Sequence, residues 1–192
     1  MNKDIFLAIN SFANQNAFLD SLMIFIAKSM PYIFIILLFY LWFSSRKNEA
    51  LFSGYSAIIG IGINKIINLF YFHPRPFMDN LGVSLLEHKA ENSFPSDHTT
   101  FLFSISLILI FFKPTRILGI FTTFLAIFCG IARIYSGVHY PFDILGAFVV
   151  AIISISAVFI FKKYFGMLNF QILILWNKLD KIIYQKNKEE NE

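Results

Sequence analysis

Residues 141–161 read PFDILGAFVVAIISISAVFIF, an apolar run whose one ionisable side chain, Asp143, stands near its start. A helix needs about 20 apolar residues to cross the hydrocarbon core of a bilayer, and this run has that length. Of the 192 residues in the chain, 57% are hydrophobic and 15% are charged. Soluble domains usually contain about 45–50% apolar residues, so the sequence predicts an integral membrane protein built from α-helices.

Four further apolar runs precede this one, and together they predict an all-α, polytopic membrane helix bundle with five transmembrane spans. Lys28 and Pro31 interrupt the first run. Pro31 is expected to kink or divide it, because proline removes a helix hydrogen bond. The third run is short for a span. The expected spans are residues 22–43, 51–71, 98–112, 117–133 and 141–161.

Both ends of the chain are amphipathic. Residues 1–17 carry apolar side chains on one side of a helix, which predicts an interfacial segment or a sixth membrane element. Residues 166–192 are expected to form an amphipathic surface helix over 168–183, followed by a solvated and disordered cytoplasmic tail. No long linker separates two units, so residues 1–192 are predicted to form a single integral-membrane domain.

Basic residues gather in three connections that lie on one side if all five segments cross the membrane. The positive-inside rule places these connections in the cytoplasm. Loop 72–97 and segment 133–143 then both face outward. The net charge of +4 is spread over the connections and forms no basic face, so the bilayer is the expected partner and nucleic acid is not. The basic residues are Arg46, Lys47, Lys113, Arg116, Lys162 and Lys163.

Three stretches hold most of the unusual polar residues, and the topology places all three at the outer ends of helices. The spacing in the third is informative, because Asp143 follows His139 by four residues and can reach its ring. A carboxylate on one imidazole nitrogen fixes the tautomer and leaves the other nitrogen free to attack. The stretches are HPRPF at 73–77, SFPSDHTT at 93–100 and ARIYSGVHYPFD at 132–143.

An anion site is predicted beside His139. Arg75, Arg133 and the backbone N–H groups of a helix that starts near Ser96 could all hold a phosphate. Arg133 and Asp143 could instead form a structural ion pair, although their spacing to His139 favours a catalytic arrangement. The loop side chains His73, His88, Glu87 and Glu91 are expected to be solvated.

The three stretches resemble the signature of the phosphatidic acid phosphatase type 2 superfamily: K-x6-R-P, then P-S-G-H, then S-R-x5-H-x3-D. The runs YFHPRPF, SFPSDHTT and HYPFD are similar to those of bacterial undecaprenyl-diphosphatases of the bacitracin-resistance type. The likeness covers nearly the whole chain. It implies hydrolysis of a polyprenyl diphosphate, undecaprenyl diphosphate, at the outer face of the bacterial cytoplasmic membrane. It also implies that neither a metal nor another cofactor is used.

The resemblance implies a role for each matching residue. His139 would attack phosphorus and form a phosphohistidine, and Asp143 would orient it. His98 would protonate the leaving oxygen and then activate water. The residues that would bind phosphate oxygens are Arg75, Arg133 and Ser96.

Three positions depart from the family pattern. Asn68 stands where the family has lysine, and the nearest lysine, Lys65, is a candidate to replace it at the phosphate. Asp97 stands in place of glycine, and its backbone N–H is a further phosphate-binding candidate. Ala132 stands in place of serine.

Two alternative functions are open at this point. Another enzyme of the superfamily would act on phosphatidylglycerophosphate, phosphatidate or lipid A phosphates. A membrane transporter or channel would need polar residues at several depths along a path, whereas those seen here gather at one end of the helices, with Lys28 and Lys65 as exceptions.

Overall fold

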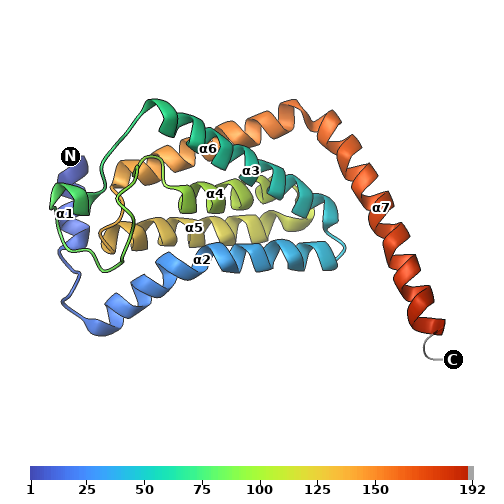
Figure 1. Cartoon of the computed structure of the whole chain (residues 1–192), viewed down its shortest axis with the longest axis horizontal. Helices are drawn as coiled ribbons and strands as arrows, with labels where there is room; N and C mark the ends of the chain where they lie inside the picture. The colour runs from blue at the N-terminus through green and yellow to red at the C-terminus, as the bar shows by residue number, and fades with distance from the viewer. Residues whose placement is uncertain (190–192) are drawn as a thin grey trace.

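The computed structural model describes the backbone of residues 1–189 and the side chains of residues 1–183. Within that part of the chain every regular element is a helix, so the all-α prediction is confirmed. Helices α2 to α6 form the bundle, and α1 lies at one end of it (Figure 1). In chain order the helices are α1 (Asn2–Asn10), α2 (Ala17–Phe43), α3 (Lys47–Phe70), α4 (Asp97–Ile110), α5 (Arg116–Tyr135), α6 (Pro141–Ile160) and α7 (Lys162–Glu189), with 3-10 turns at Pro76–Asp79 and Lys113–Thr115.

Four helical segments among the described residues are long and apolar enough to cross a bilayer: Ala17–Phe43, Lys47–Phe70, Lys113–Tyr135 and Pro141–Ile160. Helix α4 has 14 residues. At 1.5 Å per residue it is about 21 Å long, short of the roughly 30 Å hydrocarbon core. The predicted count of five or six spans is therefore higher than the four found. The reason is that α4 starts late, after loop 71–96, and is enclosed by α2, α3, α5 and α6.

Helix α2 begins before the predicted start of the first span because Asn16 caps it. The Asn16 side chain accepts hydrogen bonds from the backbone N–H groups of Phe18 at 3.0 Å and Leu19 at 3.1 Å, as an N-cap residue does. The helix continues through Pro31 and is not divided there. Pro31 has no N–H to donate to the carbonyl four residues earlier, which belongs to Ala27.

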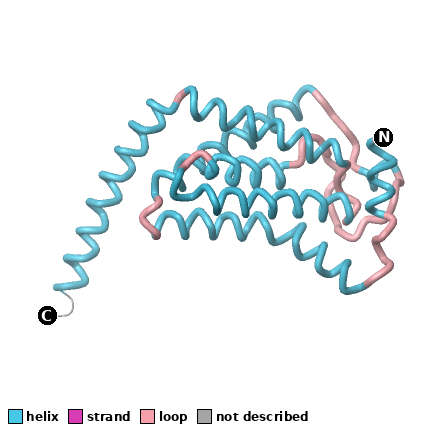
Figure 2. The backbone as a smooth tube through the Cα atoms, turned by 180° about the vertical axis from the view of Figure 1, so that it is seen from behind, coloured by secondary structure: helices cyan, strands magenta, loops and turns pink. Residues whose placement is uncertain are grey.

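The connections sort into two groups at opposite ends of the bundle (Figure 2). The short turns after α2, α4 and α6 lie at one end and carry the basic residues. Loop 71–96 and segment 136–140 lie at the other end, together with α1. The three polar stretches singled out in the sequence therefore meet at the end of the bundle away from the basic turns.

Small residues let α3, α4 and α6 approach closely. The Ser154 hydroxyl of α6 lies 3.1 Å from that of Ser56 on α3 and 3.3 Å from that of Ser104 on α4. Gly60 of α3 faces the same place, where a Cβ atom would come within 2.7 Å of Ser104 Oγ. Small side chains and hydroxyl pairs are the usual means of packing helices in a membrane, where lipid competes with apolar contacts.

Helix α7 leaves the bundle at the end that carries the basic turns (Figure 1). It is longer than predicted, because it begins at Lys162, directly after α6. Its Trp176 ring packs against Trp42 of α2, with centroids 5.1 Å apart. Of the predicted tail, residues 186–189 continue α7, and 190–192 lie outside the described residues. The interfacial position of α1 and α7 stays a prediction.

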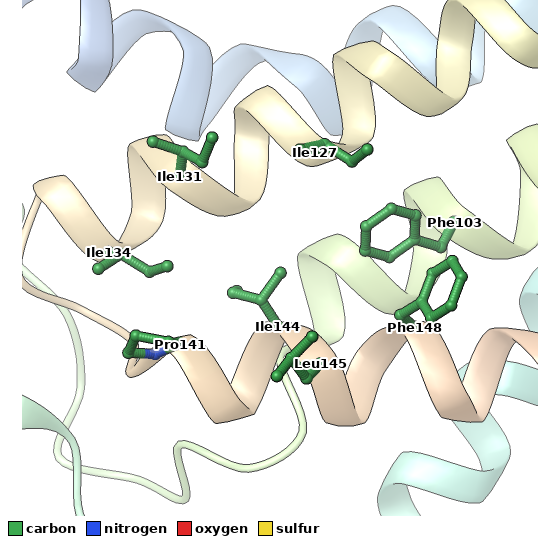
Figure 3. Close-up of a pocket in the computed structure, with 8 residues that line it drawn as sticks. All are labelled: Phe103, Ile127, Ile131, Ile134, Pro141, Ile144, Leu145 and Phe148. Carbon is green, nitrogen blue, oxygen red and sulfur yellow. The ribbon is translucent and has the colours of Figure 1, made fainter. Parts of the chain in front are cut away.

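The outer surface of the bundle is hollowed between α5 and α6 (Figure 3). This pocket is lined only by apolar side chains, so it can take an acyl or prenyl chain but offers nothing to a charged head group. Its lining residues are Phe103, Ile127, Ile131, Ile134, Pro141, Ile144, Leu145 and Phe148.

We expect Gly60→Leu to destabilise the detergent-solubilised protein by about 1–3 kcal/mol, the usual penalty of overpacking. The added side chain would collide with Ser104 and Thr100 on α4. Gly62→Leu on the same helix is the control, because a Cβ atom at Gly62 meets nothing within 4 Å. Thermal unfolding measures the difference, and equal unfolding temperatures for the two variants would contradict this packing of α3 on α4.

Candidate active site

His139 lies in the connection between α5 and α6, and its imidazole is held by Asp143 from the first turn of α6. Nδ1 of the ring lies 3.2 Å from Asp143 Oδ2. The same carboxylate oxygen accepts hydrogen bonds from the Tyr140 backbone N–H at 2.7 Å and from the Ser93 hydroxyl. Since an ionised carboxylate only accepts hydrogen bonds, Nδ1 carries the proton and the lone pair is on Nε2.

Two buried guanidinium groups face that lone pair. Arg75 Nη1 lies 3.1 Å from His139 Nε2, and Arg133 Nη2 lies 3.3 Å from the same atom. Both arginines are almost fully buried, with 4% and 2% of their surface exposed. The structure brings Arg75 and Arg133 together at His139, although the two arginines lie 58 positions apart in the chain.

Backbone carbonyls hold both arginines in place. Arg75 donates to the carbonyl of Val138 at 2.9 Å and to that of Asn92 at 3.2 Å. Arg133 donates to the Ala27 carbonyl of α2 at 3.3 Å. That carbonyl is available because Pro31 cannot supply the helix hydrogen bond that would otherwise occupy it. Pro31, which looked like a helix breaker in the sequence, thus provides an acceptor for an active-site arginine.

The charge around His139 keeps its ring neutral. Burial lowers the pKa of His139 well below its ordinary value of 6.5, and the charges of Arg133 and Arg75 lower it further. A neutral imidazole whose lone pair is on Nε2 is the nucleophilic form of histidine. The site is therefore poised for attack at neutral pH, and the two cations beside the nucleophile can hold the anion that it attacks.

The start of α4 completes the cluster. The Ser96 backbone N–H donates to the Asp143 carbonyl at 3.2 Å, which fixes α4 against α6. Ser96 Oγ is buried and has no hydrogen-bond partner among the described residues. The first N–H groups of a helix also lack intrahelical acceptors, so this end of α4 offers donors to an anion.

His98 stands on the first turn of α4 and lines an open pocket together with Arg133. Burial lowers the pKa of His98 to about 3, and the charge of Arg133 contributes. The His98 ring is therefore neutral. A bound phosphate would favour its protonated form, which an acid role requires.

The structure pairs Lys65 and Asp97 with each other. Lys65 Nζ lies 3.0 Å from Asp97 Oδ2, and Asn64 donates to Asp97 Oδ1 at 2.8 Å. The Asp97 carboxylate thus points toward α3, where it does not oppose a bound anion. The charge of Lys65 is engaged by this carboxylate. Lys65 lines a small pocket together with Arg75, but it forms no hydrogen bond or ion pair with Arg75, Arg133 or His139. Phosphate binding by Lys65 and by the Asp97 backbone N–H stays a prediction.

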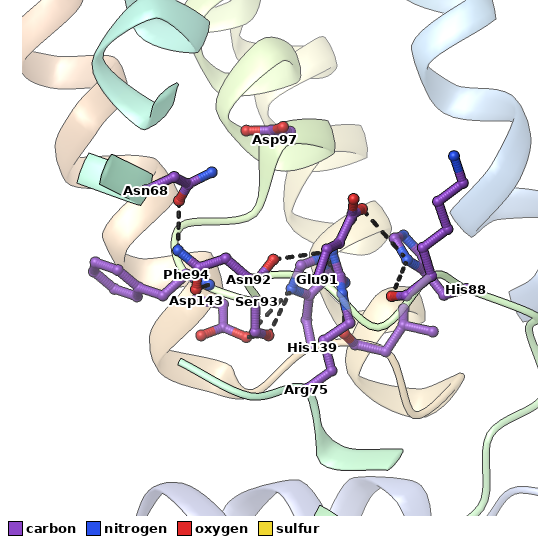
Figure 4. A network of polar contacts seen from close by, with 12 residues as sticks. Asn68, Arg75, His88, Glu91, Asn92, Ser93, Phe94, Asp97, His139 and Asp143 are labelled. Atoms are coloured by element: carbon purple, nitrogen blue, oxygen red, sulfur yellow. Dashed lines mark hydrogen bonds and ion pairs between the residues drawn. The ribbon is translucent and has the colours of Figure 1, made fainter. Parts of the chain in front are cut away.

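Loop 84–92 contributes residues that the sequence did not single out (Figure 4). His88 Nε2 lies 3.3 Å from Arg133 Nη2, and Glu91 Oε1 lies 3.5 Å from Arg75 Nη2. The expectation of a solvated His88 is wrong, because only 19% of its side chain is exposed, whereas Glu91 is 55% exposed. Ser93, whose hydroxyl donates to Asp143, begins the polar stretch 93–100, but its residue type alone does not indicate this contact. No local pattern in the sequence identifies His88 or Glu91.

Two residues position the turn that carries His139. Gly137 has a φ of +78°, and a Cβ atom there would lie 2.2 Å from the Val83 carbonyl oxygen, so no other residue fits. Asn10 of α1 donates to the carbonyls of Val83 at 2.8 Å and Tyr135 at 2.7 Å. The N-terminal segment thereby joins loop 71–96 to the end of α5.

Comparison with known proteins identifies the family. A family model described as PAP2 superfamily matches residues 49–167. The chain belongs to the PAP2 superfamily. The matched residues include His139 and the residues that meet around it, Arg75, Ser96, Arg133 and Asp143. Undecaprenyl-diphosphatase BcrC of Bacillus subtilis is 38% identical over 156 residues, which cover 80% of each chain. A Bacillus licheniformis relative named bacitracin transport permease protein BcrC is 32% identical over 100% of this chain and 96% of its own.

A solved structure has the same fold. The crystal structure of Aquifex aeolicus LpxE superposes with a TM-score of 0.70 at 24% identity and covers 81% of this chain and 93% of its own. Together with the four apolar spans, these relationships make the chain an integral membrane protein of the PAP2 superfamily.

We expect the His139 ring of this PAP2 protein to stay neutral when the pH falls below 6.5, since its pKa is lowered. A solvated histidine would gain a proton near that pH. The measurement is the ¹⁵N chemical shift of labelled histidines in detergent from about pH 8 to about pH 5, with His139→Gln assigning the signal. Inorganic phosphate should raise the titration point, and a ring that titrates near pH 6.5 without phosphate would contradict the described environment.

Proposed function

We propose that this protein hydrolyses undecaprenyl diphosphate to undecaprenyl phosphate and inorganic phosphate. The observation that carries the proposal is the place of His139 Nε2 beside the guanidinium groups of Arg75 and Arg133. A phosphoryl group held by both arginines would have its phosphorus next to that nitrogen. The choice of substrate is supported by the relative of 38% identity, which is named an undecaprenyl-diphosphatase. The reaction would recycle the lipid carrier for cell-wall synthesis and give bacitracin resistance.

The first step is transfer of the terminal phosphoryl group to His139. Nε2 attacks phosphorus while the bond from phosphorus to the bridging oxygen breaks. The electron pair of that bond goes to the bridging oxygen, which His98 protonates. Arg75 and Arg133 stabilise the negative charge of the transferring group, and Asp143 stabilises the charge that develops on the imidazole.

The second step releases phosphate. Water attacks the phosphorus of the phosphohistidine and gives a proton to His98, which is neutral after the first step. The bond between phosphorus and Nε2 breaks, and its electron pair returns to His139. The lowered pKa of His98 keeps its ring unprotonated and able to accept a proton, and the negative charge of a bound diphosphate would favour the protonated form that the first step needs.

The alternative functions find less support. A transport path would need polar groups at several depths, whereas the cluster around His139 lies at one end of the bundle. The likeness to LpxE concerns the fold alone and does not favour a different lipid phosphate. The proposed mechanism needs no metal, and no group of three or more His, Cys, Asp or Glu side chains that could hold an ion occurs among the described residues.

We also propose that the site faces the outside of the bacterial cytoplasmic membrane. The basic turns lie at the end of the bundle opposite to His139. Basic connections stay in the cytoplasm, so the end with the His139 cluster would be outside. The phosphate head group would bind there, while the prenyl chain stays between helices and lipid.

Purified protein in detergent is expected to release inorganic phosphate from undecaprenyl diphosphate, also in the presence of EDTA. His139→Ala should lose at least about 10³-fold in kcat, because it removes the nitrogen that lies beside both arginines. Unfolding temperature shows whether the variant is folded. Turnover by a folded His139→Ala, or faster release from phosphatidate or phosphatidylglycerophosphate than from undecaprenyl diphosphate, would refute the proposed reaction.

A cysteine at Lys89, which is exposed in loop 84–92, is expected to react with an impermeant maleimide in intact cells. Lys113→Cys, in the basic turn before α5, is the matched control and should react only after lysis. The native Cys129 is buried and contributes little background. The reverse labelling pattern would show that the site faces the cytoplasm.

A further inference from the structure

Lys28 is an ionisable side chain within the span formed by α2, and the mechanism above gives it no role. It stands eleven residues after the start of α2 at Ala17, about 16 Å along the helix axis. A lone charge at such a depth is unfavourable, and ionisable residues inside spans usually mark functional sites. Lys28 forms no ion pair among the described residues. It is exposed.

Lys28 lines a pocket that opens between α2 and loop 84–92. The pocket has a volume of about 450 Å³, within the range of roughly 300–1,000 Å³ that is usual for ligand sites. It combines nitrogen-bearing side chains from four different segments with an apolar wall, which suits a charged group attached to a lipid chain. Its lining residues are Lys28, Pro31, Tyr32, Leu86, Glu87, His88, His98 and Arg133.

This pocket adjoins the place of the reaction through Arg133. One Nη atom of Arg133 lies 3.3 Å from the nucleophilic nitrogen of His139, and the same side chain lines the pocket. His98, the group assigned to the leaving oxygen, lines it as well. The pocket therefore offers a place beside His98 for the part of the substrate beyond the breaking bond, and Lys28 lines the same pocket.

We propose that Lys28 binds the phosphate that stays on the lipid, and that it makes the enzyme prefer lipid diphosphates to lipid monophosphates. The inference rests on the proposed function. In a diphosphate, the group beyond the breaking bond is a second phosphate. In a monophosphate, it is an uncharged chain that gains nothing from a lysine.

Bond breaking strengthens this interaction. The electron pair of the broken bond goes to the bridging oxygen, so negative charge grows on the phosphate that remains with the lipid. A lysine beside that phosphate stabilises the transition state more than the bound substrate. Lys28 should therefore contribute to kcat/KM for diphosphates and not only to substrate binding.

Other groups around the reaction are less suited to this task. Lys65 is engaged by Asp97 at 3.0 Å, and the apolar pocket of Figure 3 has no polar lining side chain. Glu87 also lines the Lys28 pocket and opposes an anion, but it is exposed and forms no ion pair with Lys28. With Arg133 and Lys28 against Glu87, the pocket keeps a net positive charge.

The test compares Lys28→Met and Lys28→Arg on farnesyl diphosphate and farnesyl phosphate. Lys28→Met is expected to lower kcat/KM for the diphosphate by about 10- to 100-fold, the effect of losing a hydrogen bond to a charged group. The loss on the monophosphate should stay below about threefold. Lys28→Arg should recover most of the diphosphate activity, because it restores the charge. Inhibition by inorganic phosphate, which binds at the arginines, should be unchanged by Lys28→Met.

Lys113→Met, at the opposite end of the bundle, is the control for removal of a lysine, and unfolding temperatures show whether each variant is folded. Equal losses on both substrates, or weaker inhibition by inorganic phosphate, would show a structural role and overturn the inference. Unchanged diphosphate activity in Lys28→Met would overturn it too. Wild-type protein that is inactive on the diphosphate but active on another lipid phosphate would refute the proposed function, a result distinct from all of these.

Discussion

Two guanidinium groups share one small buried space with the imidazole of His139, and their mutual repulsion is the constraint on which the site depends. Like charges repel strongly where water is excluded, and a buried cation without a counter-ion destabilises a protein. Each arginine is therefore tied to backbone carbonyls, and the exposed Glu91 gives Arg75 only a partial counter-charge. A bound phosphate relieves this repulsion, so an empty site of this kind favours anions before any specific contact to the rest of a ligand is counted.

Several features that would weaken an ordinary helix or loop support this arrangement. Pro31 removes a hydrogen bond from the middle of α2, and the carbonyl it frees accepts from Arg133. Gly137 allows the turn before His139 to bend where Val83 leaves no room for a side chain. Asn10 joins two segments whose backbone groups would otherwise lack partners at the buried end of the bundle. Each of these features by itself lowers the stability of its helix or loop or leaves it unchanged. Each is explained by the active-site residue or segment that it holds in position.

The bundle also separates the chemistry from the lipid. Short helix α4 is enclosed by its neighbours, so its first turn presents backbone donors inside the end of the bundle while the longer helices face the bilayer. Two pockets adjoin the arginines of the site, one lined by Arg75 and one by Arg133, and they differ in charge. The pocket at Arg75 is also lined by Lys65, Glu91 and Asp97, so its two cations face two carboxylates. The pocket at Lys28 and Arg133 keeps positive charge and adjoins the span α2. A lipid substrate that needs both a charged site and an apolar path fits the second pocket.

The amino-acid sequence was enough to predict the membrane-embedded, all-helical character, most helix limits to within a few residues, and Arg75, Arg133 and Asp143 as neighbours of His139. The length of an apolar run and the spacing of charged residues are local properties of a sequence. His139, Asp143 and Arg133 can be recognised as a motif because they lie close together in the chain. The remaining features became visible in the folded chain. The tertiary structure shows that α4 is too short to be counted as a span, that Lys65 is paired with Asp97, and that His88, Ser93 and Ala27 support the site. These features depend on contacts between segments that are far apart in the chain. They cannot be predicted from the sequence, because every residue type has a backbone carbonyl that can accept a hydrogen bond and no local pattern shows which distant segment will lie beside it.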